Sequence, residues 1–182
     1  MKSLKTYINE DFKLGKNKIN KPTEYKYFPK YKTELKKILK ERLVEDKDAD
    51  LNDIDVSNIY DMTHLFEYLD PHNIDISEWD VSNAKDMNYM FSNCRLFNCD
   101  LSEWDVSNVT DMSGIFYECH NFDSDLSNWD VSNAKWMTLM FYGCEKFKGK
   151  GLEDWDISGV EDMRMIFNGC NSLKNKPSWY EG

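Results

Sequence analysis

Aspartate is the residue type in this chain whose number and spacing could do chemistry. One aspartate opens each copy of the sequence Asp-Val-Ser-Asn or a close variant of it, and the copies follow one another at intervals of 25, 25, 25 and 26 residues. A serine stands two positions after each aspartate. The candidate interaction surface consists of four such pairs: Asp80 and Ser82, Asp105 and Ser107, Asp130 and Ser132, Asp156 and Ser158.

Three interpretations of these aspartates stay open, because like charges on neighbouring strands repel and need compensation. The carboxylates accept hydrogen bonds from serine or turn N–H groups, or are simply solvated. Alternatively, they bind a basic partner. The third interpretation is calcium, which is disfavoured because the glycine-rich nonapeptide spacing of calcium-binding β-rolls is absent.

The histidines and cysteines give weaker indications of a functional site than the aspartates do. The three histidines, His64, His72 and His120, occupy unrelated repeat positions, and no nucleophile, metal-binding or phosphate-binding motif occurs. Five cysteines without a Cys-x-x-Cys pair favour a reduced compartment. We expect one of them, Cys99, to be a loop thiol. The sequence predicts no catalytic residue, no cofactor, no metal ligand and no enzyme activity.

Apolar residues recur in the same register as the aspartates. One repeat cannot bury its apolar side alone, so stacked repeats should place like residues on like residues. The predicted core columns are Trp79, Trp104, Trp129 and Trp155; Met87, Met112, Met137 and Met163; Phe91, Phe116, Phe141 and Phe167; and Cys94, Cys119, Cys144 and Cys170. We interpret the cysteine column as buried core, with a ligand or disulfide role as the alternative.

Two periodicities alternate within each repeat. Met112, Ile115, Phe116 and Cys119 follow the i, i+3, i+4, i+7 spacing of one helix face. Trp104 and Val106 stand two apart, as on a strand with one buried face. The pattern predicts an α/β fold: a leucine-rich-repeat-like solenoid with one short parallel β-strand and one short helix in each repeat of about 25 residues.

Four segments are expected. Residues 1–30 are a basic N-terminal tail or docking segment, and residues 31–50 carry a capping helix in which Leu35, Ile38, Leu39 and Leu43 share one side. Residues 51–176 form the five-repeat solenoid. Residues 177–182 form a C-terminal cap, with Trp179 at the next position of the tryptophan column.

The motif F-x-x-C-x-x-F-x-x-D-L-S-x-W-D-V-S-N-V-T-D-M resembles the BspA-like branch of leucine-rich repeats. That branch includes the 25-residue repeat of bacterial and mycoplasma surface lipoproteins. The resemblance covers about Tyr31 to Trp179. It implies a solenoid used for protein or surface interaction rather than for catalysis.

The distribution of charge and one tryptophan in place of a recurring aspartate indicate the kind of partner. Residues 1–40 hold 12 Lys/Arg against 4 Asp/Glu, whereas residues 41–182 hold 11 against 29, which disfavours nucleic acid as a partner. Trp136 replaces the aspartate found at positions 61, 86, 111 and 162. It is either an exposed interface anchor or a residue packed on a neighbouring Met or Tyr.

Together these features predict a non-catalytic protein–protein interaction module whose protein partner is unidentified. Two alternatives are a structural or assembly component of a virion or surface, docked through its N-terminal segment, and an acidic inhibitor that mimics nucleic acid. No signal peptide and no stretch long enough to span a membrane is evident, so we expect a cytoplasmic protein or one assembled into a particle.

Overall fold

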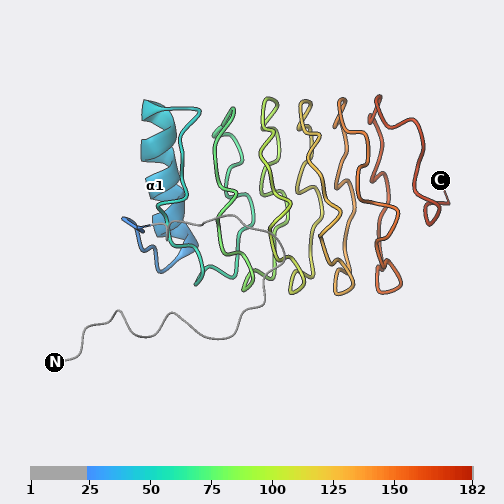
Figure 1. The fold of residues 1–182 in the computed structure, drawn as a ribbon, viewed down its shortest axis with the longest axis horizontal. Coiled ribbons are helices and arrows are strands. Elements are labelled where there is room, and N and C mark those ends of the chain that lie inside the picture. The colour runs from blue at the N-terminus through green and yellow to red at the C-terminus, as the bar shows by residue number, and fades with distance from the viewer. Residues whose placement is uncertain (1–23, 182) are drawn as a thin grey trace, which may run out of the picture.

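The chain winds into a stack of similar coils with one helix at its N-terminal end (Figure 1). The computed structural model describes residues 24–181. Within that range the single helix is α1, Lys32–Glu45, and β-pairing is limited to isolated parallel bridges between successive coils. Four of these bridges join one position of each coil to the next: Asp61 to Asp86, Asp86 to Asp111, Asp111 to Trp136, and Trp136 to Asp162.

The predicted strand and helix in every repeat, and with them the α/β class, are wrong. Each coil is instead a succession of tight turns, as in the bonds from Ile115 N–H to the Met112 carbonyl (3.2 Å) and from Cys119 N–H to the Phe116 carbonyl (3.0 Å). An α-helix needs φ near −63° at every residue. Gly114 and Glu118 lie within the expected helix with φ of 56° and 57°, which ends any helical run there.

The apolar columns nevertheless stack in register along the coils. The rings of Phe91 and Phe116 are 5.8 Å apart at 7°, and those of Phe116 and Phe141 are 5.8 Å apart at 17°. The indoles of Trp79 and Trp104 are 6.4 Å apart at 3°. These side chains are buried, so the core is a row of like residues running through the stack.

Each buried tryptophan also finds a hydrogen-bond acceptor in the coil before its own. The Trp104 indole N–H donates to the Ile76 carbonyl at 3.1 Å, and that of Trp129 donates to the Leu101 carbonyl at 2.9 Å. A buried donor without a partner would cost the free energy of its desolvation. The tryptophan column therefore aligns the coils as well as filling them.

Helix α1 covers the first coil. Its buried side chains are Leu35, Leu39 and Leu43, and its Arg42 guanidinium is 2.9 Å from the Asp53 carboxylate. Of the predicted tail at residues 1–30, residues 1–23 lie outside the described residues. The remainder pairs with the first coil, because Tyr27 forms a parallel bridge with Ile54.

Candidate interaction surface

The aspartates of the candidate surface each close a turn within their own coil. Asp105 Oδ1 accepts the Ser107 N–H at 3.0 Å and the Ser107 hydroxyl at 2.6 Å. The backbone N–H bond recurs at all four positions, from Ser82 to Asp80, Ser107 to Asp105, Ser132 to Asp130 and Ser158 to Asp156. One oxygen of each carboxylate is thus engaged locally.

The second oxygen of each carboxylate is free for a partner. All four aspartates are exposed, and their Oδ2 atoms accept no hydrogen bond within residues 24–181. Hydrogen bonds from Ser132 lower the pKa of Asp130, and those from Ser158 lower the pKa of Asp156. These carboxylates therefore stay ionised at neutral pH, with one oxygen facing solvent.

The turn and the charge can be separated by substitution. Asparagine keeps the Oδ1 acceptor, so D105N/D130N should unfold at nearly the same urea concentration as the native chain. D105A/D130A loses the three hydrogen bonds to Ser107 and Ser132, so its free energy of unfolding should be about 2 kcal/mol lower than that of the native chain. Equal destabilisation by the two double variants would show that charge, and not the turn, stabilises these positions.

Two further aspartate columns share this geometry: the second consists of Asp50, Asp75, Asp100 and Asp125, and the third consists of Asp61, Asp86, Asp111 and Asp162. The third was evident from the sequence as the column that Trp136 breaks, whereas the second was not predicted. Each has Oδ1 bonded to the N–H two residues later, as in Asp100 with Ser102 and Asp111 with Ser113, at 3.0 and 2.8 Å. The signal in the sequence is the recurrence of Asp at two more positions of each repeat. Burial raises the pKa of Asp86, and the neighbouring carboxylates of Asp111 and Asp61 raise it further.

Trp136 interrupts the column of Asp61, Asp86, Asp111 and Asp162. It is in register with Asp111 and Asp162 through parallel bridges, and 41% of its surface is exposed. Lys135 lies above the ring, with Nζ 5.9 Å from the ring centroid, and also pairs with Glu161 at 3.4 Å. The indole therefore lies at the surface between two aspartates, beside a lysine.

The asparagines that follow Ser82, Ser107 and Ser132 bond neighbouring coils to one another. Asn108 Nδ2 donates to the Ser82 carbonyl at 2.9 Å, and Asn133 Nδ2 donates to the Ser107 carbonyl at 2.8 Å. These bonds hold the exposed aspartates of successive coils at a constant separation. The candidate surface is consequently a rigid array rather than a set of independent loops.

Three members of the cysteine column, Cys94, Cys119 and Cys144, are buried, the fourth, Cys170, is half-buried, and all five cysteines are free thiols. Each thiol in the column donates to a phenylalanine carbonyl of the preceding coil, as from Cys119 to Phe91 and from Cys144 to Phe116, both at 3.0 Å. Cys99 lies in an irregular segment outside this column, and it is buried as well, with 6% of its surface exposed. No group of three or more potential ligands close enough to hold a metal ion occurs in residues 24–181.

Burial should make these thiols unreactive. It raises the pKa of Cys99 to about 11 and that of Cys170 to about 12. Because the thiolate is the nucleophile, we expect Ellman's reagent at pH 8 to react roughly 100-fold more slowly with the native chain than with the chain in guanidinium. Cys170, which is only half-buried, should react first. Rapid reaction of Cys119 in the native chain would contradict this burial.

The comparisons with known proteins give one match. The family model described as "Mycoplasma protein of unknown function, DUF285" matches residues 33–150 and 137–180. This is the BspA-like repeat family in Mycoplasma, so the match supports the resemblance at the level of the family. Searches of curated proteins and of solved structures returned no match. Over the part of the chain that the structure describes, no helix has the length and apolar character needed to cross a bilayer.

Proposed function

The chain belongs to the DUF285 family, and from that premise we propose that it is a non-catalytic module that binds a basic protein partner. The observation that carries the proposal is Trp136, an exposed indole in a column of aspartates. Tryptophan is enriched among residues that dominate binding energy, and a ring of polar residues around it excludes water once a partner is bound.

Electrostatics favour a partner that carries lysine or arginine. Residues 41–182 hold 29 Asp/Glu against 11 Lys/Arg, and the Oδ2 atoms of Asp105 and Asp130 are free of partners within the described part of the chain. The raised pKa of Asp86, caused first by burial and then by Asp111 and Asp61, indicates repulsion along the column. A basic partner would relieve this repulsion and would associate faster at low salt.

Trp136→Asp tests the proposal with little risk to folding, because the other four coils carry aspartate at this position. Partners are first captured with the native full-length chain and purified, and their dissociation constants are then measured. We expect W136D to weaken binding by about 2 kcal/mol, or roughly 30-fold.

The matched control is Tyr60→Asp, which adds the same charge at a residue that is 59% exposed and precedes Asp61 of the same column. It should leave the dissociation constant within about twofold, since surface changes away from an anchor have small effects. Equal affinity of W136D and the native chain for every partner captured would rule out Trp136 as the anchor.

A further inference from the structure

Hydrogen bonds between coils run in one direction along one side of the stack. Alternate residues of each coil donate their N–H groups to carbonyls of the next coil, as from Met87 to Asp111 and from Phe91 to Ile115, both at 2.9 Å. The ladder ends with four bonds of the same kind, from Met137 to Asp162, Leu139 to Arg164, Phe141 to Ile166 and Gly143 to Asn168. Every coil therefore presents donors on its C-terminal side.

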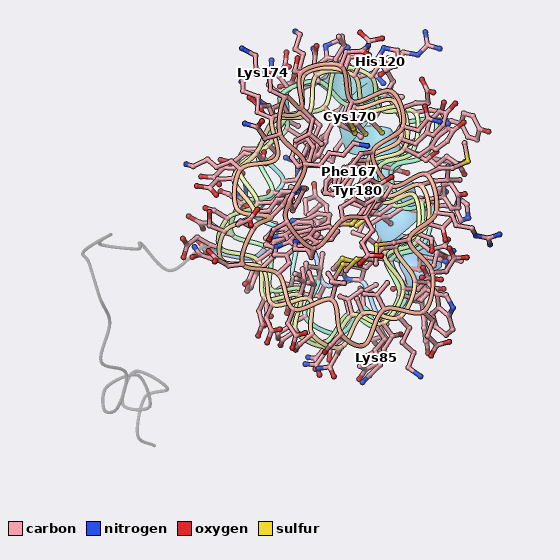
Figure 2. The ribbon with its side chains drawn as sticks, turned by 90° about the vertical axis from the view of Figure 1, so that its right-hand side faces the viewer. Lys85, His120, Phe167, Cys170, Lys174 and Tyr180 are labelled. Carbon is pink, nitrogen blue, oxygen red and sulfur yellow. The ribbon has the colours of Figure 1, made fainter. Side chains whose placement is uncertain are left out.

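The last coil presents the same donors without acceptors. The N–H groups of Met163, Met165, Phe167 and Gly169 have no hydrogen-bond partner within residues 24–181. Figure 2 looks onto this end of the stack and shows Phe167 and Tyr180 near its centre. Because a backbone edge with unpaired donors favours pairing with a further chain segment, this end is a candidate binding site.

An apolar groove lies beside these donors. Its volume is about 1040 Å³, and its apolar lining consists of Leu139, Ile157, Met163, Met165, Trp179 and Tyr180. Apolar side chains of a bound segment would be removed from water there, while its backbone meets the free N–H groups.

The charges around the groove favour a basic occupant. Glu161, Asp162 and Glu181 line it, against one guanidinium, that of Arg164. Arg164 is bound to Asp162 at 2.6 Å, and Glu161 pairs with Lys135 at 3.4 Å. The pair of Glu161 and Lys135 is exposed and therefore weak, so a lysine or arginine of a partner can compete for Glu161.

The groove adjoins the candidate surface at Trp136. Trp136 forms a parallel bridge with Asp162, which lines the groove. Thr138 and Leu139, which follow Trp136 closely in the chain, line it as well. A partner anchored on the Trp136 indole can therefore reach the groove.

A second copy of the chain does not fit this end. Two copies related by a two-fold axis would place the same N–H donors against each other, without carbonyls to accept them. Head-to-tail stacking is blocked as well, because α1 covers the N-terminal end and buries Leu35, Leu39 and Leu43. The occupant must instead be a segment of another protein that supplies carbonyl oxygens.

We propose that the last coil binds an extended segment of another protein, in which apolar residues alternate with lysine or arginine. The four free N–H groups recur at every second residue, so they match the carbonyls of a segment of about seven residues. Successive side chains of an extended segment point to opposite sides, so the apolar ones face the groove and the basic ones are left for Glu161 and Glu181. That this segment belongs to the basic partner rests on the proposed function.

Amide hydrogen exchange of the full-length chain with a synthetic peptide tests the site. The probe is the acetylated and amidated peptide Lys-Val-Lys-Val-Lys-Val-Lys. At saturating peptide, the amides of Met163, Met165, Phe167 and Gly169 should exchange at least about tenfold more slowly, because each gains an acceptor. The amide of Phe28, at the other end of the stack, should not change (Figure 1).

Two results of the exchange experiment would overturn the proposal. The first is unchanged exchange of the four amides at saturating peptide. The second is exchange in the free chain as slow as that of the Phe91 amide, which is bonded to Ile115, since the four donors would then be paired already.

Matched controls separate the charge of the segment from its position. The peptide with glutamate in place of each lysine should bind at least about tenfold more weakly. M165K, which puts a cation at a groove residue that is 50% exposed, should weaken binding of the lysine peptide at least about fivefold. L96K makes a similar change at a leucine that is 45% exposed in the middle of the stack, and should leave the dissociation constant within about twofold. Equal affinity for the two peptides would overturn the basic segment, and equal effects of M165K and L96K would overturn the groove.

The partners captured for the Trp136 test distinguish this proposal from the proposed function. M165K should weaken their binding at least about fivefold, in addition to the loss expected from W136D. Loss of affinity in W136D alone would overturn the groove as their binding site and leave Trp136 as the anchor. Loss of affinity in M165K alone would overturn Trp136 as the anchor and leave the groove.

Discussion

Replacing Phe116 by alanine is expected to lower the free energy of unfolding by about 4 kcal/mol, the upper part of the range for a buried phenylalanine. The ring lies at the centre of the core column, 3.8 Å from Phe122 and 5.8 Å from both Phe91 and Phe141, measured between centroids. Neighbouring coils share these contacts, so the cavity weakens two coil interfaces at once. Urea denaturation followed by tryptophan fluorescence measures the change.

Phe28→Ala is the matched control, since this phenylalanine is 64% exposed. It should change the free energy of unfolding by no more than about 0.5 kcal/mol. A second consequence concerns cooperativity. In a stack where each coil contacts only its neighbours, a weak central interface should let the two halves unfold separately, which lowers the denaturant slope. An unchanged slope and a loss below about 1 kcal/mol would show that the stack does not depend on this column.

Replacing Gly151 by alanine is expected to lower the free energy of unfolding by about 4 kcal/mol, from left-handed backbone strain and overpacking together. Gly151 has φ of 89°, and an added Cβ would lie 2.2 Å from the Ser127 nitrogen and 2.5 Å from its Cα. Backbone atoms cannot rotate away as a flexible side chain could. Thermal and urea unfolding of G151A measure the effect.

The position of Gly151 explains why this glycine matters. The step from Asp130 to Asp156 is one residue longer than the other steps, and the extra residue falls in the segment that contains Gly149 and Gly151. The control is Gly159→Ala, whose Cβ would lie 3.2 Å from the Ser132 carbonyl and 3.8 Å from the Ala134 carbonyl. It should cost less than about 1 kcal/mol. Equal stability of G151A and G159A would mean that the longer coil relaxes freely.

Much of the core could be predicted from the sequence, although Met163 and Cys170 of the predicted columns are only partly buried and the buried Phe97, Phe122 and Phe147 were not predicted. Equal spacing placed Trp104 over Trp79 and Phe116 over Phe91, and the spacing of Leu35, Leu39 and Leu43 indicated the helix that became α1. Column positions must recur from coil to coil because each coil meets an identical neighbour.

The conformation of the coil could not be predicted in the same way. The spacing of Met112, Ile115, Phe116 and Cys119 is compatible with a helix, but also with successive turns that bury the same residues. Gly114 and Glu118 take positive φ, and the Phe116 N–H bonds to Met140 of the next coil at 3.1 Å rather than within a helix. Contacts between coils replaced the bonds of the expected helix.

The candidate surface was identified in part. The Asp-Val-Ser-Asn column, Trp136 and the aspartate column that Trp136 breaks were evident from the sequence, whereas the second aspartate column and the hydrogen-bond geometry that all three columns share became clear only from the structure. The unpaired backbone N–H groups of Met163 and Phe167 could not be predicted from the sequence. Backbone hydrogen bonds between coils can form with almost any residue type, so they do not constrain which residues occur there.

By itself, the sequence determined which residues meet, since a repeated spacing puts the same side chain at the same place in every coil. Only the tertiary structure decided how the backbone passes between those places and which of its polar groups are left free at the end of the stack. The physical reason is that side-chain burial depends on residue type, whereas backbone N–H and carbonyl groups are alike in nearly all residues and are paired by the neighbouring coil.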